Sequence, residues 1–88
     1  MRIKDGYELV NRSGQNVVVS KRGSTAVTDN YIVLTDTAAF LWRLLSEKEV
    51  TKTQMLEALL ENFNISTVLA LGDIDIFIRT MKENGIIE

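Results

Sequence analysis

The segment from Leu34 to Leu45 constrains the fold of this chain more than any other part of its sequence. A short apolar run typical of a β-strand ends at Leu34, and Thr35 follows as a residue that can cap a helix. A threonine hydroxyl accepts a hydrogen bond from a free amide of the first helical turn, and Asp36 suits the positive end of the helix dipole. The helix predicted from here carries Trp42, the only tryptophan of the chain. The segment therefore predicts where strands end and helices begin.

The residues before this point have the pattern of three short strands. We expect strands over residues 7–11, 16–20 and 30–34, the last of them supported by its β-branched and aromatic side chains. The turn-forming residues 11–14 include a glycine and predict a β-hairpin between the first two strands. The polar segment 21–25 is expected to be a loop.

Three helices are predicted in the remainder of the chain. In the first, apolar residues recur at offsets of three, four and seven, which defines one face of a helix: Ala38, Leu41, Trp42 and Leu45. The second helix begins after Thr51, since Gln54 three residues later completes a capping box.

The third helix is the longest, about residues 67–84, with Ser66 as its cap. Gly72 inside it costs about 1 kcal/mol relative to alanine and predicts a bend or a close contact. Gly85 supplies the left-handed residue that ends the helix. Residues 86–87 are expected to fold back as an apolar contact or a short strand.

Two rows of side chains along this third helix predict different environments. One row has the spacing of a core stripe: Val68, Leu71, Ile74, Phe77, Ile78 and Met81. The other mixes large apolar residues with polar ones: Leu69, Asp73, Ile76, Thr80 and Glu83. The mixed row would line a groove, or it would widen the buried face of a helix packed between others.

Composition places the chain among small soluble proteins. It has 88 residues, expected to form one domain over residues 1–88, and its 45% apolar content is too high for a disordered chain. The order of its elements predicts an α+β fold of winged helix-turn-helix type, with a three-stranded antiparallel sheet at the N-terminus followed by three helices. We find no membrane-spanning run and no signal-peptide pattern, which predicts a cytoplasmic protein.

The residue types present argue against catalysis. Cysteine and histidine are both absent, which removes thiol chemistry and the usual base and metal ligand near neutral pH. Asp73 and Asp75 lie two residues apart and point to different sides of a helix, so they cannot act as paired carboxylates. We expect no enzyme activity, no cofactor and no metal. The net charge of −2 also argues against nucleic-acid binding.

A family resemblance rests on motifs near both ends of the helical part. Leu34, Thr37, Ala38 and Trp42 occupy matching places in the first helix of the PqqD family, and Met81, Gly85 and Ile86 match the end of its last helix. The chain resembles this family, the prototype of the RiPP recognition element, over residues 7–87. It departs at Thr35, where the family commonly has asparagine.

The resemblance implies a peptide-binding role without catalysis. Family members hold the leader segment of a ribosomally made precursor peptide and present it to a modifying enzyme, often of the radical S-adenosylmethionine type. The leader adds a strand to the third strand, beside the third helix. This implies a binding site formed by Tyr31, Ile32, Val33 and Leu34 on the strand side, and by Ile74, Asp75, Ile78, Arg79 and Lys82 on the helix side. The helix-side residues could instead be core and solvated surface.

Two alternatives stay open at this point. A winged-helix DNA-binding protein has the same order of elements, but the helix after Thr51 offers Lys52 and Gln54 followed by Glu57 and Glu61. A general adaptor or dimerisation module would use the exposed apolar row and would self-associate without peptide. The family resemblance also allows a homodimer, so self-association alone does not separate the two.

Overall fold

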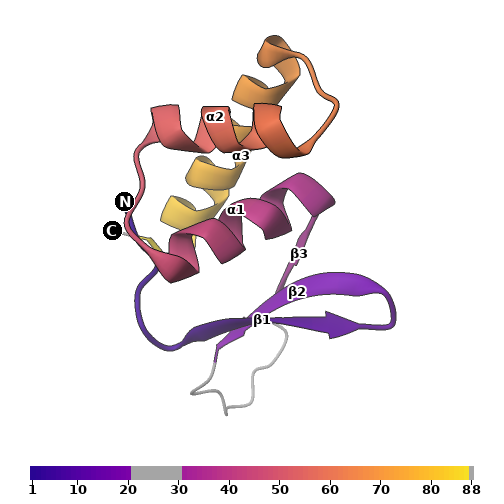
Figure 1. Cartoon of the computed structure of the whole chain (residues 1–88). Helices are drawn as coiled ribbons and strands as arrows, with labels where there is room; N and C mark the ends of the chain where they lie inside the picture. Colours follow the sequence, from indigo (N-terminus) through magenta and orange to yellow (C-terminus); the bar gives the residue numbers. More distant parts are fainter. Residues whose placement is uncertain (21–30, 88) are drawn as a thin grey trace.

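A computed structural model describes residues 1–20 and 31–87, and three antiparallel strands form its sheet. They are β1 (Tyr7–Arg12), β2 (Gln15–Ser20) and β3 (Ile32–Leu34), in the order β1-β2-β3 (Figure 1). β2 pairs with both neighbours. Within the described residues the third strand begins at Ile32, later than predicted. The predicted loop 21–25 and Asn30 lie outside the described residues.

The predicted hairpin between β1 and β2 is confirmed, with a tighter turn than expected. Ser13 and Gly14 form the turn, and both have positive φ angles, 53° and 85°. A two-residue turn of this kind matches the twist of the flanking strands. The side chain of Asn11 accepts a hydrogen bond of 3.3 Å from the amide of Gly14, which supports the turn.

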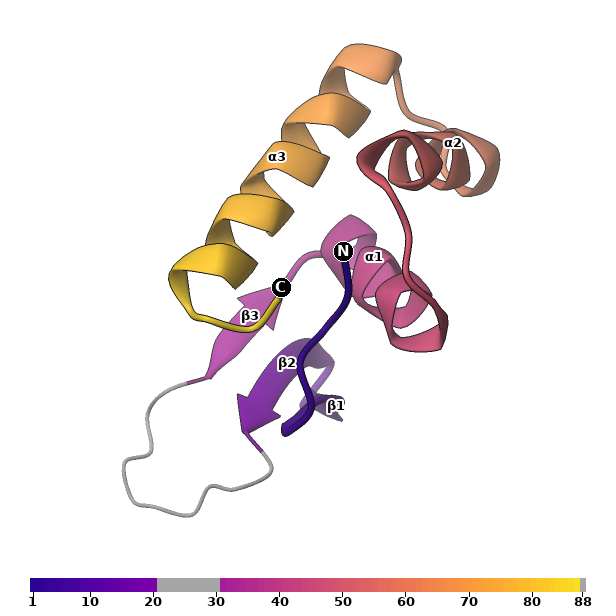
Figure 2. The ribbon, with the colours of Figure 1, turned by 90° about the vertical axis from the view of Figure 1, so that its left-hand side faces the viewer.

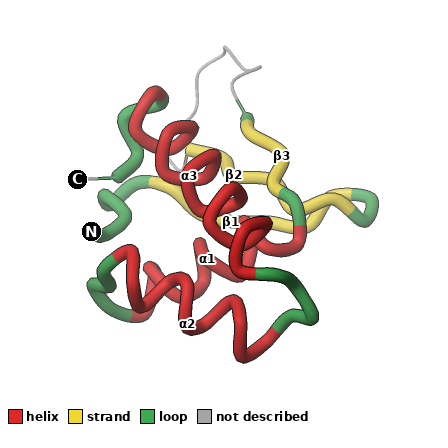
Figure 3. The backbone as a smooth tube through the Cα atoms, turned by 90° about the horizontal axis from the view of Figure 1, so that it is seen from above, coloured by secondary structure: helices red, strands yellow, loops and turns green. Residues whose placement is uncertain are grey.

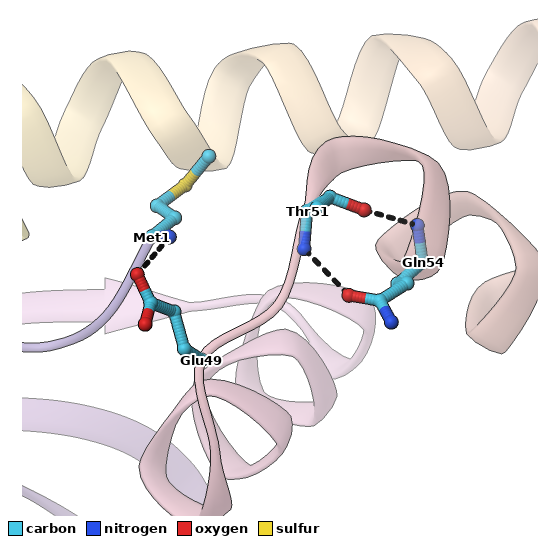
Figure 4. Close-up of polar contacts among 4 residues, drawn as sticks. All are labelled: Met1, Glu49, Thr51 and Gln54. Atoms are coloured by element: carbon cyan, nitrogen blue, oxygen red, sulfur yellow. Dashed lines mark hydrogen bonds and ion pairs between the residues drawn. The ribbon is translucent and has the colours of Figure 1, made fainter.

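The three predicted helices are confirmed as α1 (Asp36–Glu47), α2 (Lys52–Asn62) and α3 (Thr67–Glu83). Each begins at the expected cap, because the hydroxyls of Thr35, Thr51 and Ser66 accept hydrogen bonds from first-turn amides. At α2 the capping box is complete, since Gln54 Oε1 also accepts from the Thr51 amide at 2.8 Å (Figure 4). The same view shows the ion pair between the Met1 amino group and Glu49. Its N–O distance is 3.4 Å, and an exposed pair of this kind contributes little to stability.

The helices pack together on one side of the sheet, and α3 runs beside β3 (Figure 2). The core contains side chains from all three helices and from the sheet, including Leu41, Met55, Leu59, Ile74 and Met81, which have no exposed surface. The stripe predicted for α3 is confirmed at Ile74, Phe77 and Met81. It is wrong at Val68 and Leu71, which are exposed, because the buried face continues to Ala70 instead.

The end of the chain returns to its beginning. Gly85 has a φ of 69° and ends α3 as predicted, and Ile86 and Ile87 are buried. Ile87 bridges Ile3, and the Lys4 amide donates to the Ile86 carbonyl at 2.8 Å, so the two ends of the chain lie side by side (Figure 1). The predicted contact of residues 86–87 is therefore confirmed. In the part of the chain that the structure describes, no helix is long and apolar enough to span a bilayer.

Candidate functional site

Strand β3 lies at the edge of the sheet. Among the described residues it pairs only with β2, so its other edge has no strand partner there. An unpaired strand edge presents backbone N–H and C=O groups that can pair with an incoming extended peptide. The edge strand is therefore the first component of a candidate binding site.

A groove separates β3 from α3. It encloses about 140 Å³ and is lined by residues of both elements and of the first turn of α1: Ile32, Val33, Leu34, Thr35, Ala38, Asp73, Ile76, Phe77, Thr80 and Met81. Leu34, Phe77 and Met81 are buried. Val33 and Ile76 remain 49% and 58% exposed. The groove thus combines buried apolar side chains with two open ones that a ligand could cover.

One charged side chain lies among these apolar residues. Asp73 Oδ2 accepts a hydrogen bond of 2.9 Å from the hydroxyl of Thr37 in the first turn of α1. The hydroxyls of Thr37 and Thr35 are 3.3 Å apart and share a further hydrogen bond. These contacts join the start of α1 to α3 and fix the Asp73 carboxylate beside the groove.

A second hollow lies at the other end of β3. It has a volume of about 400 Å³ and includes Tyr31 and Ile32 from the β3 side and Asn84 and Ile86 from the end of the chain. Ile32 lines both hollows. The other residues that line the second hollow belong to β1 and β2, so this hollow extends over the sheet: Tyr7, Val18, Val19 and Ser20.

The residues predicted for the helix side lie elsewhere on α3. Ile74 has no exposed surface and belongs to the core. Asp75, Ile78, Arg79 and Lys82 line a separate depression, together with Met1 and Lys52. Positions two apart on a helix, such as Asp73 and Asp75, are separated by about 160° around its axis. The structure therefore brings Ile32, Val33 and Leu34 together with Asp73, Ile76 and Thr80, and not with the predicted helix-side residues.

The residues of α3 that line the groove had a signal in the sequence. Asp73, Ile76 and Thr80 belong to the mixed row that the helical spacing separated from the core stripe, while Leu69 and Glu83 of that row do not line the groove. The family resemblance supplied a different set, because motif matching fixes neighbours in sequence and not the rotation of the helix.

A larger depression of about 730 Å³ lies between β1 and α1, away from β3. Its lining mixes acidic, basic and apolar side chains, among them Glu8, Trp42 and Arg43. Among the described residues no three acidic, histidine or cysteine side chains are grouped in a way that could hold a metal ion. The groove beside β3 is thus the better candidate for a binding site, because it joins an unpaired strand edge to open apolar side chains.

Comparison with known proteins identifies similar structures and the family of this chain. A lasso peptide synthetase B1, solved in complex with its leader peptide, matches with a TM-score of 0.70 at 21% identity, over 97% of this chain and 93% of that one. TbiB1, solved in complex with the TbiA(beta) leader peptide, matches with a TM-score of 0.72 at 18% identity, over 100% and 95% of the two chains. No curated protein matches the sequence. The family model for coenzyme PQQ synthesis protein D matches residues 15–87, and the chain therefore belongs to the PqqD family.

Proposed function

We propose that this protein binds the leader segment of a ribosomally made precursor peptide and takes no part in catalysis itself. The observation that carries the proposal is the groove between the unpaired edge of β3 and α3. Membership of the PqqD family supports it, as does the presence of leader peptides in the two structurally similar proteins. The bound segment would add a fourth strand beside β3, with backbone hydrogen bonds supplying affinity and side-chain pockets supplying selectivity.

The helix side of this proposed site consists of Asp73, Ile76 and Thr80. An added strand places alternate side chains on opposite faces, so every second residue of the peptide would point toward the groove. Val33 and Ile76 would be covered by an apolar side chain of the leader. The leader should therefore contain an apolar residue with extended, alternating neighbours.

Because of Asp73, the proposed site should prefer a leader that carries a hydrogen-bond donor at this point. One of its carboxylate oxygens is bonded to Thr37, and the other has no partner among the described residues. A hydrogen-bond donor on the leader, such as a basic side chain or a hydroxyl, would satisfy that oxygen. Asp73→Asn keeps the size of the side chain and removes its charge, so we expect weaker binding of a leader with a basic residue here. A leader whose basic residue is replaced by glutamine should bind both proteins alike, and an equal loss for both leaders would contradict this role.

The direct test is a titration of isotope-labelled protein followed by backbone amide shifts. The probes are synthetic peptides that tile the short reading frames encoded beside this gene. A leader should give saturable shifts at β3 and at residues 73–80. A series of peptides without such shifts, together with salt-sensitive shifts on adding duplex DNA, would favour a winged-helix DNA-binding function instead.

The identity of the modifying enzyme is a further part of the proposal. We propose a radical S-adenosylmethionine enzyme, because this class often serves the family that the chain resembles. Co-purification with the enzyme encoded beside the gene tests it, and an ATP-dependent enzyme in that place would contradict it. Self-association of the chain is a separate expectation, which sedimentation velocity of the protein without peptide measures.

A further inference from the structure

A basic depression lies on the side of α3 that faces away from the groove. It has a volume of about 510 Å³ and is lined by Met1, Lys52, Asp75, Ile78, Arg79 and Lys82. Lys52 forms an ion pair with Asp75 at 2.6 Å. Among the described residues Arg79 and Lys82 have no such partner. Arg79 and Lys82 are thus two exposed cations outside any described ion pair, on a protein whose net charge is −2.

This depression cannot belong to the same bound peptide strand as the groove. Thr80 lines the groove and Lys82 lines the depression, and positions two apart on a helix are separated by about 160° around the axis. Viewed from above, α3 lies between β3 and α2, whose first residue is Lys52 (Figure 3). A leader added to β3 would therefore leave Arg79 and Lys82 accessible.

We infer that this depression binds an acidic segment of a protein partner other than the leader. Ile78 and Met1 provide apolar surface beside the two cations, which suits a side chain such as leucine flanked by carboxylates. A nucleic acid is the less suitable polyanion, because phosphate binding draws on an extended basic surface and Asp75 lies within this one. Charge pairs at such a rim accelerate association and select partners more than they add affinity. The partner and the leader bind opposite sides of α3 and so can be held at the same time.

The test uses the full chain, isotope-labelled, and a capped five-residue peptide in which leucine lies between two pairs of glutamates. A control peptide has glutamines in place of the glutamates. The acidic peptide should give saturable amide shifts at Lys52 and at residues 78–82, weaker at high salt and absent with the glutamine peptide. The double variant Arg79→Glu, Lys82→Glu should raise the dissociation constant about tenfold or more.

Two further variants separate this effect from folding and from overall charge. Arg12→Glu, Lys48→Glu makes the same change in net charge at exposed positions outside the depression, and should bind the acidic peptide like the unmodified chain. Arg79→Gln, Lys82→Gln removes the cations without introducing repulsion, and should give an intermediate affinity. Equal binding by all variants, equal shifts with the glutamine peptide, or stronger shifts at the same amides with duplex DNA would each overturn the inference.

The outcome of the acidic-peptide test does not depend on whether the proposed leader site exists. Amides of β3 and residues 73–77 report only on the leader, and amides of Lys52 and residues 81–82 report only on the acidic peptide. The charge reversal of Arg79 and Lys82 should leave the leader's affinity unchanged. If no leader binds but the acidic peptide does, the proposed function fails and the second surface stands. If the leader alone binds, the second surface is refuted.

Discussion

Replacing Ile76 by glutamate tests the groove with little risk to the fold. The side chain is 58% exposed on the surface of α3, and glutamate is a good helix former. Fully burying an isoleucine side chain is worth about 1.5–3 kcal/mol, so covering its 58% exposed part is worth about 0.9–1.7 kcal/mol. That range corresponds to about 5- to 20-fold in affinity. Glutamate would also place a second negative charge three positions from Asp73, so we expect a loss of about tenfold or more.

Calorimetric titration with the leader found by tiling measures this loss. Val68→Glu is the matched control, because Val68 is a 78% exposed apolar residue of the same helix that does not line the groove. Circular dichroism of both variants verifies that each is folded. The reasoning is refuted if Ile76→Glu binds the leader as tightly as the unmodified protein, or if Val68→Glu weakens binding equally.

Three further predictions concern stability and are measured by urea or thermal unfolding. Gly72→Ala should stabilise the protein by about 0.4–1 kcal/mol, because a Cβ there would meet no atom within 4 Å and the backbone is helical; a loss of stability would contradict the open space beside it. Thr51→Ala should cost about 1 kcal/mol by removing the hydroxyl that accepts from Gln54, whereas Thr51→Ser should cost less, and equal losses would contradict a capping role. Leu41→Ala should cost about 2–5 kcal/mol at a fully buried position, comparable with the roughly 3–5 kcal/mol that a core of this size supplies, so the variant should be largely unfolded, and a cooperative transition near that of the unmodified protein would refute the assignment.

The helix boundaries could be read from the sequence because local chemistry determines them. Thr35, Thr51 and Ser66 each bond an amide three residues later, so the signal and its effect lie within one turn. The hairpin was predictable for the same reason. Its two-residue turn was not, since the positive φ of Ser13 depends on the pairing of the two strands. Gly72 shows the limit of a single-residue signal: the expected close contact is absent, because nothing lies within 4 Å of its missing side chain.

For the proposed site, the sequence and the structure agree on the strand side and differ on the helix side, and the reason lies in the rotation of α3. The family resemblance supplied the residues of β3, and in the described part of the chain this strand lies at an edge of the sheet, paired only with β2. Which row of α3 faces that edge depends on how deeply Ile74 and Phe77 enter the core shared with α1 and α2. Their burial turns Ile76 toward β3 and turns Arg79 away from it. A prediction that follows this burial would place Asp73, Ile76 and Thr80 in the groove.

The rotation of α3 also determines whether a leader and a partner protein can be bound at the same time. A helix with one face in the core can still expose two sides, and α3 exposes an apolar one beside β3 and a basic one beside Lys52. Because Ile74 and Phe77 hold both sides in fixed relation, a ligand on one does not compete for space with a ligand on the other. A small protein could in this way hold a leader and an acidic partner together. The affinity of either ligand should then be the same whether the other is present or absent, unless α3 moves when one binds.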